Sequence, residues 1–116
     1  MTLREKQSVF ATMAARLIQK AFDLGFEVTL GEAWRSPLEA ERLAGIGVGI
    51  SKSSHCDRLA IDLNLFIDSK YIIDPEKYRP LGEFWELLGG IWGGRFDVKK
   101  KDYDTKIGFD SGHFEF

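Results

Sequence analysis

The sequence predicts an α+β fold in one domain, because a stretch with helical spacing is followed by stretches with the two-residue period of strands. Apolar residues recur three and four positions apart over residues 3–24. Apolar and polar residues alternate over residues 26–34, 58–67 and 113–116. Since 116 residues suit one hydrophobic core, we expect residues 1–116 to form a single domain.

Composition and charge argue against two broad classes of function. Hydrophobic residues make up 44% of the chain and charged residues 29%, which favours a packed core over a disordered segment. The net charge is −2, and the basic residues are scattered apart from residues 99–101, unlike the basic stripe of a nucleic-acid binder. No run is long enough to cross a membrane. We expect a monomer that neither binds nucleic acid nor inserts into a membrane.

The amino terminus and the single cysteine bear on cellular location. Residues 1–22 mix charged and apolar side chains and lack the separate apolar region of a secretory signal. Cys56 is the only cysteine, so no intrachain disulfide can form and nothing indicates an oxidising compartment. We expect synthesis in the cytoplasm without a signal peptide, and we interpret Cys56 as structural.

The first half of the chain predicts a helix, a strand and a shorter helix. Apolar side chains of residues 3–24 share one face of the first helix. The strand over residues 26–34 follows, and its polar face is expected to continue to Arg35. Ser36 then caps a second helix, which has Pro37 at its first position.

A glycine-rich segment follows the second helix. Residues 45–54 contain Gly-x-Gly-x-Gly, but the strand-to-helix context of a nucleotide site is missing. We interpret this segment as a mobile surface loop.

The second half predicts two strands and one helix. The longer strand has leucine and isoleucine on one face and Asp62 on the other. An amphipathic helix is expected over residues 80–88, and a loop that crosses the surface over residues 92–108. Further short strands could lie within that loop or over residues 71–74. In the terminal strand the phenylalanines share one face, and His113 shares the other with Glu115.

Two histidines and one aspartate are the candidate metal ligands. His55 directly precedes the longer strand, while Asp62 and His113 lie on polar strand faces. Two neutral imidazoles and a carboxylate are a common ligand set for a catalytic metal, because they leave a position for water or substrate. A histidine considered alone is more often a hydrogen-bonded, partly buried side chain. Because Arg35 is expected on a polar face as well, one cleft could gather all four, with zinc as the default metal.

Further polar side chains are candidates for catalysis or substrate binding. Asp110 lies three residues before His113, and Ser-Gly between them favours a tight turn. Asp110 could take a proton from a metal-activated water and pass it to the leaving amine, or it could simply bind its own backbone. Arg35 could bind a substrate carboxylate or stabilise an oxyanion, or form a surface salt bridge. Ser54 could bind substrate or orient His55.

Four short segments together form a recognisable pattern: an arginine–serine pair, a serine–histidine pair, a following aspartate, and a late aspartate–histidine pair. In order they are Arg35-Ser36, Ser54-His55, Asp62-Leu63 and Asp110-x-x-His113-Phe114. The pattern resembles that of the VanY-like zinc peptidases, which include D-Ala-D-Ala carboxypeptidases and phage L-alanyl-D-glutamate endolysins. Their signature runs S-x-H-x(6)-D in outline, so either Ser53 or Ser54 could be its serine. The resemblance spans roughly residues 28–116.

The resemblance implies an α+β fold in which a small antiparallel sheet carries a zinc site and helices pack on one side, as in Hedgehog and D,D-peptidase domains. The implied ligands of Zn²⁺ are His55, Asp62 and His113. Asp110 would be the general base, and Arg35 would hold substrate and polarise the scissile carbonyl. Ser53 and Ser54 would contact substrate.

The implied substrate is the stem peptide of bacterial peptidoglycan. The acidic residue is Glu in the vancomycin-resistance carboxypeptidases, whereas Asp110 resembles the endolysin branch. With the small size and the lack of a signal, this favours an L-alanyl-D-glutamate endopeptidase that reaches the cell wall after release, with a phage holin as one route. The alternatives are a D,D-carboxypeptidase, an Fe(II) oxygenase, whose His and Asp typically lie nearly adjacent on a strand, and a non-catalytic zinc-stabilised module.

Overall fold

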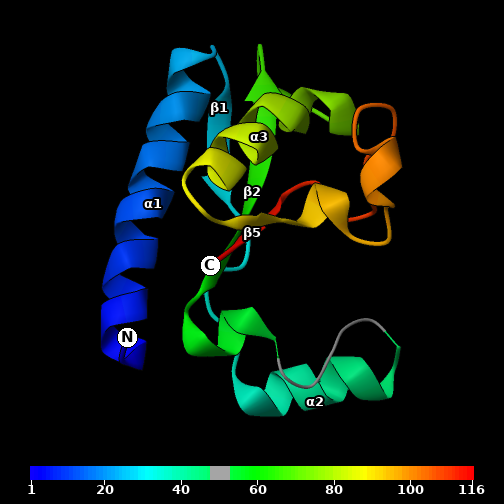
Figure 1. Ribbon diagram of the computed structural model, residues 1–116. Helices are drawn as coiled ribbons and strands as arrows, with labels where there is room; N and C mark the ends of the chain where they lie inside the picture. Colours follow the sequence, from blue (N-terminus) through cyan, green and yellow to red (C-terminus); the bar gives the residue numbers. More distant parts are fainter. Residues whose placement is uncertain (48–52) are drawn as a thin grey trace.

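The computed structural model describes residues 1–47 and 53–116, and it confirms the α+β fold. A five-stranded antiparallel sheet has the order β1-β2-β5-β4, with β3 paired to the end of β2. In Figure 1 helix α1 runs alongside this sheet and α3 lies across it, while α2 lies apart at the bottom of the view. Among the described residues, no helix combines the length and apolar character that a membrane span requires.

The bounds of the regular elements are as follows. The α-helices are α1 (Leu3–Asp23), α2 (Pro37–Gly45) and α3 (Arg79–Leu87). The strands are β1 (Glu27–Leu30), β2 (Ala60–Ile67), β3 (Lys70–Tyr71), β4 (Ile91–Trp92) and β5 (His113–Glu115). Short 3-10 helices are η1 (Ser54–Asp57), η2 (Pro75–Tyr78), η3 (Gly93–Arg95) and η4 (Lys100–Asp102). The predicted glycine-rich loop lies in part, at residues 48–52, outside the described residues.

The predicted helix boundaries are confirmed by their caps. The Thr2 side chain accepts a hydrogen bond from the Glu5 backbone at the start of α1, and the Glu5 carboxylate reaches back to Thr2. Ser36 caps α2 by accepting from the backbone N–H of Glu39. Beyond α1, Gly25 adopts a φ of 90°, which favours glycine and turns the chain toward β1.

The face of the sheet beneath α1 and α3 forms the hydrophobic core. Its largest fully buried side chains come from both helices and from β2, β4 and β5: Leu17, Leu63, Leu65, Leu81, Trp85, Trp92 and Phe114. Trp85 packs edge to face against Phe10 and Phe114, with ring centroids 5.7 and 5.9 Å apart. Because the apolar residues of β2 and β5 face this core, alternation turns their polar residues to the opposite face.

The strands predicted over residues 26–34 and 58–67 are both shorter than expected. The strand predicted over residues 26–34 ends at Leu30, although Gly31 and Glu32 still exchange backbone hydrogen bonds with Asp62. Beyond Glu32 the chain turns toward α2, which begins at Pro37, so Arg35 is not on a strand face. The strand predicted from residue 58 begins at Ala60, because Arg58 has a φ of 57° and cannot be extended.

The prediction of a surface loop over residues 92–108 is wrong at its start. Trp92 belongs to β4, pairs with Phe114 and is fully buried. Its indole N–H donates to the Ser111 carbonyl at 2.7 Å. A two-residue strand has no visible period, whereas the burial of a tryptophan strongly favours this packing. Trp92 therefore anchors the turn that precedes β5.

Candidate metal centre

Asp62 and His113 meet because of the register between β2 and β5. The two residues are direct partners in the antiparallel ladder, so their side chains share a face. The neighbouring pair, Ile61 with Phe114, faces the core. Asp62 Oδ1 lies 3.1 Å from His113 Nδ1. The alternation predicted from the sequence thus puts both candidate ligands on one face, as the structure has them.

His55 reaches the same place from η1, just before β2. The Ser53 hydroxyl accepts a hydrogen bond from the His55 backbone N–H at 3.2 Å and so caps this turn. The His55 carbonyl accepts one from the backbone of Arg35, also at 3.2 Å. Held from both sides, the His55 side chain is 2% exposed and its Nε2 lies 3.3 Å from Asp62 Oδ1.

The geometry of these three side chains fits a divalent metal. One ligand atom from each of His55, Asp62 and His113 lies within 4.8 Å of the other two. Zinc bonds of about 2.0–2.1 Å in tetrahedral geometry separate neighbouring ligand atoms by roughly 3.3 Å. The two measured contacts of Asp62 Oδ1, 3.3 and 3.1 Å, are close to that separation. The set therefore fits zinc with little rearrangement.

Without a metal, Asp62 and His113 strongly shift each other's pKa. Burial opposes the charged form of Asp62, but hydrogen bonds from His113 and His55 outweigh it and lower the pKa of Asp62 to about 2. Burial likewise opposes the charged form of His113, but its hydrogen bonds to Asp62 and Glu115 raise the pKa of His113 to about 9. A proton on His113 thus partly balances the carboxylates around it.

Asp110 lies beside the cluster at the turn that leads into β5. The His113 backbone N–H donates to the Asp110 carbonyl at 3.1 Å, which forms the predicted tight turn. This turn brings Asp110 Oδ2 to 3.9 Å from His113 Nδ1. Within the described part of the chain, the Asp110 carboxylate accepts no hydrogen bond, which disfavours the self-capping alternative. Burial raises the pKa of Asp110 above its usual value.

Two glycines allow this turn to approach the sheet. A Cβ on Gly93 would come within 2.1 Å of the Asp110 carbonyl oxygen, and one on Gly112 within 2.8 Å of the Leu63 carbonyl oxygen. The Leu63 N–H in return donates to the Gly112 carbonyl at 2.9 Å. Side chains at either position would push Asp110 away from His113, so both glycines position the site.

Arg35 lies at the His55 side of the centre and not on a strand. Its guanidinium Nη2 pairs with Glu32 Oε1 at 2.6 Å, and its side chain is 16% exposed. Its positive charge is near enough to Asp110 to oppose part of the rise that burial causes in the pKa of that carboxyl. The Arg35 Nε is buried without a partner among the described residues. Arg35 thus combines the ion pair of the alternative interpretation with donor capacity for a substrate.

The two serines differ in their contacts. Ser53 is buried and caps η1, as described above. Ser54 donates from Oγ to Glu115 Oε2 at 3.1 Å. Both hydroxyls therefore have protein partners, and their contact with substrate stays a prediction. Cys56 lies in the same turn but does not belong to the ligand cluster.

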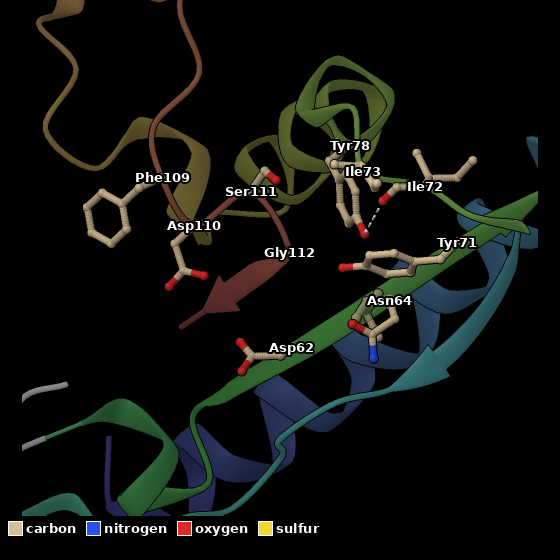
Figure 2. A pocket seen from close by; sticks show the side chains of 11 residues that line it. Asp62, Asn64, Tyr71, Ile72, Ile73, Tyr78, Phe109, Asp110, Ser111 and Gly112 are labelled. Atoms are coloured by element: carbon tan, nitrogen blue, oxygen red, sulfur yellow. Dashed lines mark hydrogen bonds between the residues drawn. The ribbon is translucent and has the colours of Figure 1, made fainter. Parts of the chain in front are cut away.

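A pocket of about 280 Å³ opens next to Asp62 and Asp110. Figure 2 shows both carboxylates facing the same space, with Tyr71 and Asn64 further along the pocket. Its remaining wall comes from β2, the segment after β3 and the turn before β5: Leu63, Ile72, Ile73, Tyr78, Phe109, Ser111 and Gly112. A peptide lying in this pocket would pass directly beside Asp62, one of the candidate metal ligands, and Asp110.

Two glutamates belong to the site although the sequence assigned them no role. Glu115 Oε1 lies 2.8 Å from His113 Nε2, and Glu32 Oε1 lies 4.0 Å from His55 Nδ1. Alternation already placed Glu115 on the face of His113, so its proximity was detectable. Glu32 gave no such signal, because it follows the end of β1.

Comparison with solved structures supports the α+β fold that the sequence predicted. No protein-family model matches the chain, and no curated protein does either. The L-Ala D-Glu endopeptidase ChiX of Serratia marcescens superposes with a TM-score of 0.65 and 18% identity, over 88% of this chain and 76% of that one. A mutant of the vancomycin resistance D,D-pentapeptidase VanY from a VanB-type cassette, with Zn(II), gives 0.61 and 18%, over 92% and 70%. The chain therefore has the fold of the VanY-like zinc peptidases, with a His-Asp-His cluster between its sheet and η1.

Proposed function

We propose that the chain is a zinc-dependent peptidase that hydrolyses the L-alanyl-D-glutamate bond of peptidoglycan stem peptides. The observation that carries this proposal is the meeting of His55, Asp62 and His113 around one point, with Asp110 beside them at the edge of a pocket. One similar structure is an L-Ala D-Glu endopeptidase and the other a D,D-pentapeptidase with Zn(II). The Zn(II) of the second supports zinc, and both support a cell-wall peptide as substrate.

Asp110 has the position and the proton affinity for general acid–base catalysis. When bound, zinc would supply an activated water and polarise the scissile carbonyl. Asp110 takes the proton from the attacking water and returns it to the amine of the departing D-glutamate residue. Because burial raises the pKa of Asp110, this carboxylate accepts a proton more readily than a fully exposed one would.

Arg35 holds the substrate on the other side of the centre. The ion pair with Glu32 fixes the guanidinium and leaves Nε free of protein partners among the described residues. From there Arg35 binds the carbonyl or carboxylate of the peptide, and its charge stabilises the oxyanion of the tetrahedral intermediate. Ser53 and Ser54 contribute mainly by holding η1, with substrate contact as their second role.

The choice of bond follows from Asp110 and from the pocket. An aspartate at this position matches the endopeptidase branch of the resemblance. An endopeptidase needs a groove that continues beyond the scissile bond, and the pocket runs from Asp62 and Asp110 toward Tyr71. We propose that the monomer acts on the cell wall after release from the cytoplasm.

Digestion of purified sacculi by the zinc-loaded protein tests this function. We expect free amino groups on D-glutamate and free carboxyl groups on L-alanine, identified by mass spectrometry of the released peptides. Release of D-alanine alone would replace the proposal with a D,D-carboxypeptidase. No released product from zinc-loaded, folded protein would favour the non-catalytic module.

A further inference from the structure

The two ring nitrogens of His113 have different carboxylate partners. Nδ1 faces Asp62 Oδ1 at 3.1 Å inside the cluster, and Nε2 faces Glu115 Oε1 at 2.8 Å outside it. A neutral imidazole has one N–H and one lone pair, and an ionised carboxylate can only accept. Glu115 is the closer of the two carboxylates, so it favours the proton on Nε2 and leaves the Nδ1 lone pair directed at the metal centre.

Glu115 is itself held in place by three elements. The Ser54 hydroxyl of η1 donates to its second carboxylate oxygen at 3.1 Å. The Trp85 indole of α3 donates to its backbone carbonyl at 2.8 Å. Its own strand, β5, pairs it with Ala60 of β2. The carboxylate is therefore oriented before any metal arrives, and its side chain is only 22% exposed.

His55 has no equivalent partner among the described residues. Its Nδ1 is buried without a hydrogen bond, and Glu32 Oε1 lies 4.0 Å away while it pairs with Arg35. A contact of 4.0 Å is too long for a hydrogen bond. Glu115 and Glu32 each lie next to one histidine, but in the described structure only Glu115 is within hydrogen-bond distance of its histidine.

We propose that Glu115 is a positioning residue of the metal centre, which keeps the proton of His113 on Nε2 and so makes Nδ1 the metal ligand. Through Ser54 the same carboxylate also connects the β5 ligand to the turn that carries His55. Such outer partners orient metal-bound histidines and increase their basicity. This inference rests on the metal site of the proposed function, but it does not depend on which bond is cleaved.

Zinc affinity of Glu115 variants tests the inference without any substrate. Competition with a chromophoric chelator gives the dissociation constant of zinc for the wild type, Glu115→Ala and Glu115→Gln. We expect about 10–100-fold weaker binding for Glu115→Ala. Glu115→Gln should stay within a few-fold of the wild type, because the amide oxygen still accepts from Nε2. Glu83→Ala, an exposed change on α3, should change nothing. Equal affinities in all four proteins would overturn the proposal.

A spectroscopic measurement on the wild type covers the case in which Glu115→Ala fails to fold. In ¹⁵N NMR of the zinc-loaded protein, we expect His113 Nε2 to carry the proton and Nδ1 to show the shift of a metal-bound nitrogen. A proton on Nδ1 with zinc at Nε2 would overturn the proposal. Zinc binding as expected but without peptide cleavage would refute only the proposed function, whereas a wild type that binds no zinc would refute both.

Discussion

His113 and His55 reach the same centre from two differently built regions. His113 lies on a strand, opposite Asp62 in the ladder, and both of its ring nitrogens have carboxylate partners. His55 lies on a short 3-10 turn, and its outer nitrogen has no hydrogen bond. The sheet half of the site is thus preformed, while the turn half is held by backbone contacts with Ser53 and Arg35. Regular pairing positions ligands more rigidly than turns do.

The largest effect is expected at Asp110, in the turn that leads into β5. Asp110→Asn removes the proton acceptor but keeps the size of the side chain, so cleavage should fall about 10²–10⁴-fold while zinc stays bound. Kinetics on a stem-peptide substrate, together with zinc analysis, check this. Asp97→Asn is a matched control, because Asp97 is exposed and its φ of 59° suits asparagine. Normal cleavage by Asp110→Asn would remove Asp110 from the mechanism.

The two histidines should differ in what they contribute to the metal-free fold. His113→Ala and His55→Ala should both lose zinc. His113→Ala also leaves the carboxylates of Asp62 and Glu115 without their shared partner, so it should lower the free energy of unfolding by about 1–3 kcal/mol more than His55→Ala does. Urea unfolding of both variants in chelator measures the difference. A larger loss of stability for His55→Ala would contradict the view that the sheet half is the preformed part of the site.

Much of the sheet half could be predicted from the sequence, because a period of two residues places side chains reliably. The alternation around His113 separated the phenylalanines from the polar residues, and a Ser-Gly pair indicated the turn after Asp110. The contact between Ser54 and Glu115 joins residues 61 positions apart, and no local pattern reports it. The burial of Trp92 depends on a two-residue strand that has no period to detect.

The turn half was harder to predict, because its geometry depends on where β1 ends. The expected polar strand face does not extend to Arg35, since backbone pairing with β2 ends at Glu32. Arg35 reaches the centre instead through the ion pair with Glu32 and the backbone bond to His55. The prediction that Arg35 lies near the site is thus right in position, but the strand face on which it was based does not extend that far.

Glu32 offers a way to test the turn half. Glu32→Ala frees the guanidinium of Arg35, so cleavage should fall about 10-fold or more through misplacement of that group, chiefly in kcat. Zinc affinity should change less than in Glu115→Ala, because Glu32 makes no hydrogen bond to His55.

A matched control exists for the Glu32 experiment on α2. Glu39 and Arg42 have the same three-residue spacing and the same 2.6 Å contact, but both are exposed. Glu39→Ala should therefore leave kcat unchanged. If Glu32→Ala and Glu39→Ala behave alike, the Glu32–Arg35 pair has no role in catalysis.

The smallest effect concerns the pH dependence of the metal-free protein. The folded-state pKa of His113, about 9, lies above the ordinary histidine value of 6.5. Protonated His113 therefore stabilises the fold fully below about pH 6.5, and this stabilisation is lost as the pH rises through about 9. Between pH 7 and pH 8 we expect a loss of about 1 kcal/mol, measured by urea unfolding in chelator. His113→Ala should lack this slope, and an equal slope in that variant would assign the titration elsewhere.

The most direct test of the zinc peptidase centre measures metal content and cell-wall hydrolysis in the same preparation. We expect one zinc per chain, and loss of turbidity when the protein is added to outer-membrane-permeabilised bacteria. Chelation should abolish the turbidity loss, and zinc but not iron should restore it. Undiminished hydrolysis after complete zinc removal, or restoration by iron alone, would contradict the assignment of His55, Asp62 and His113 to a zinc peptidase.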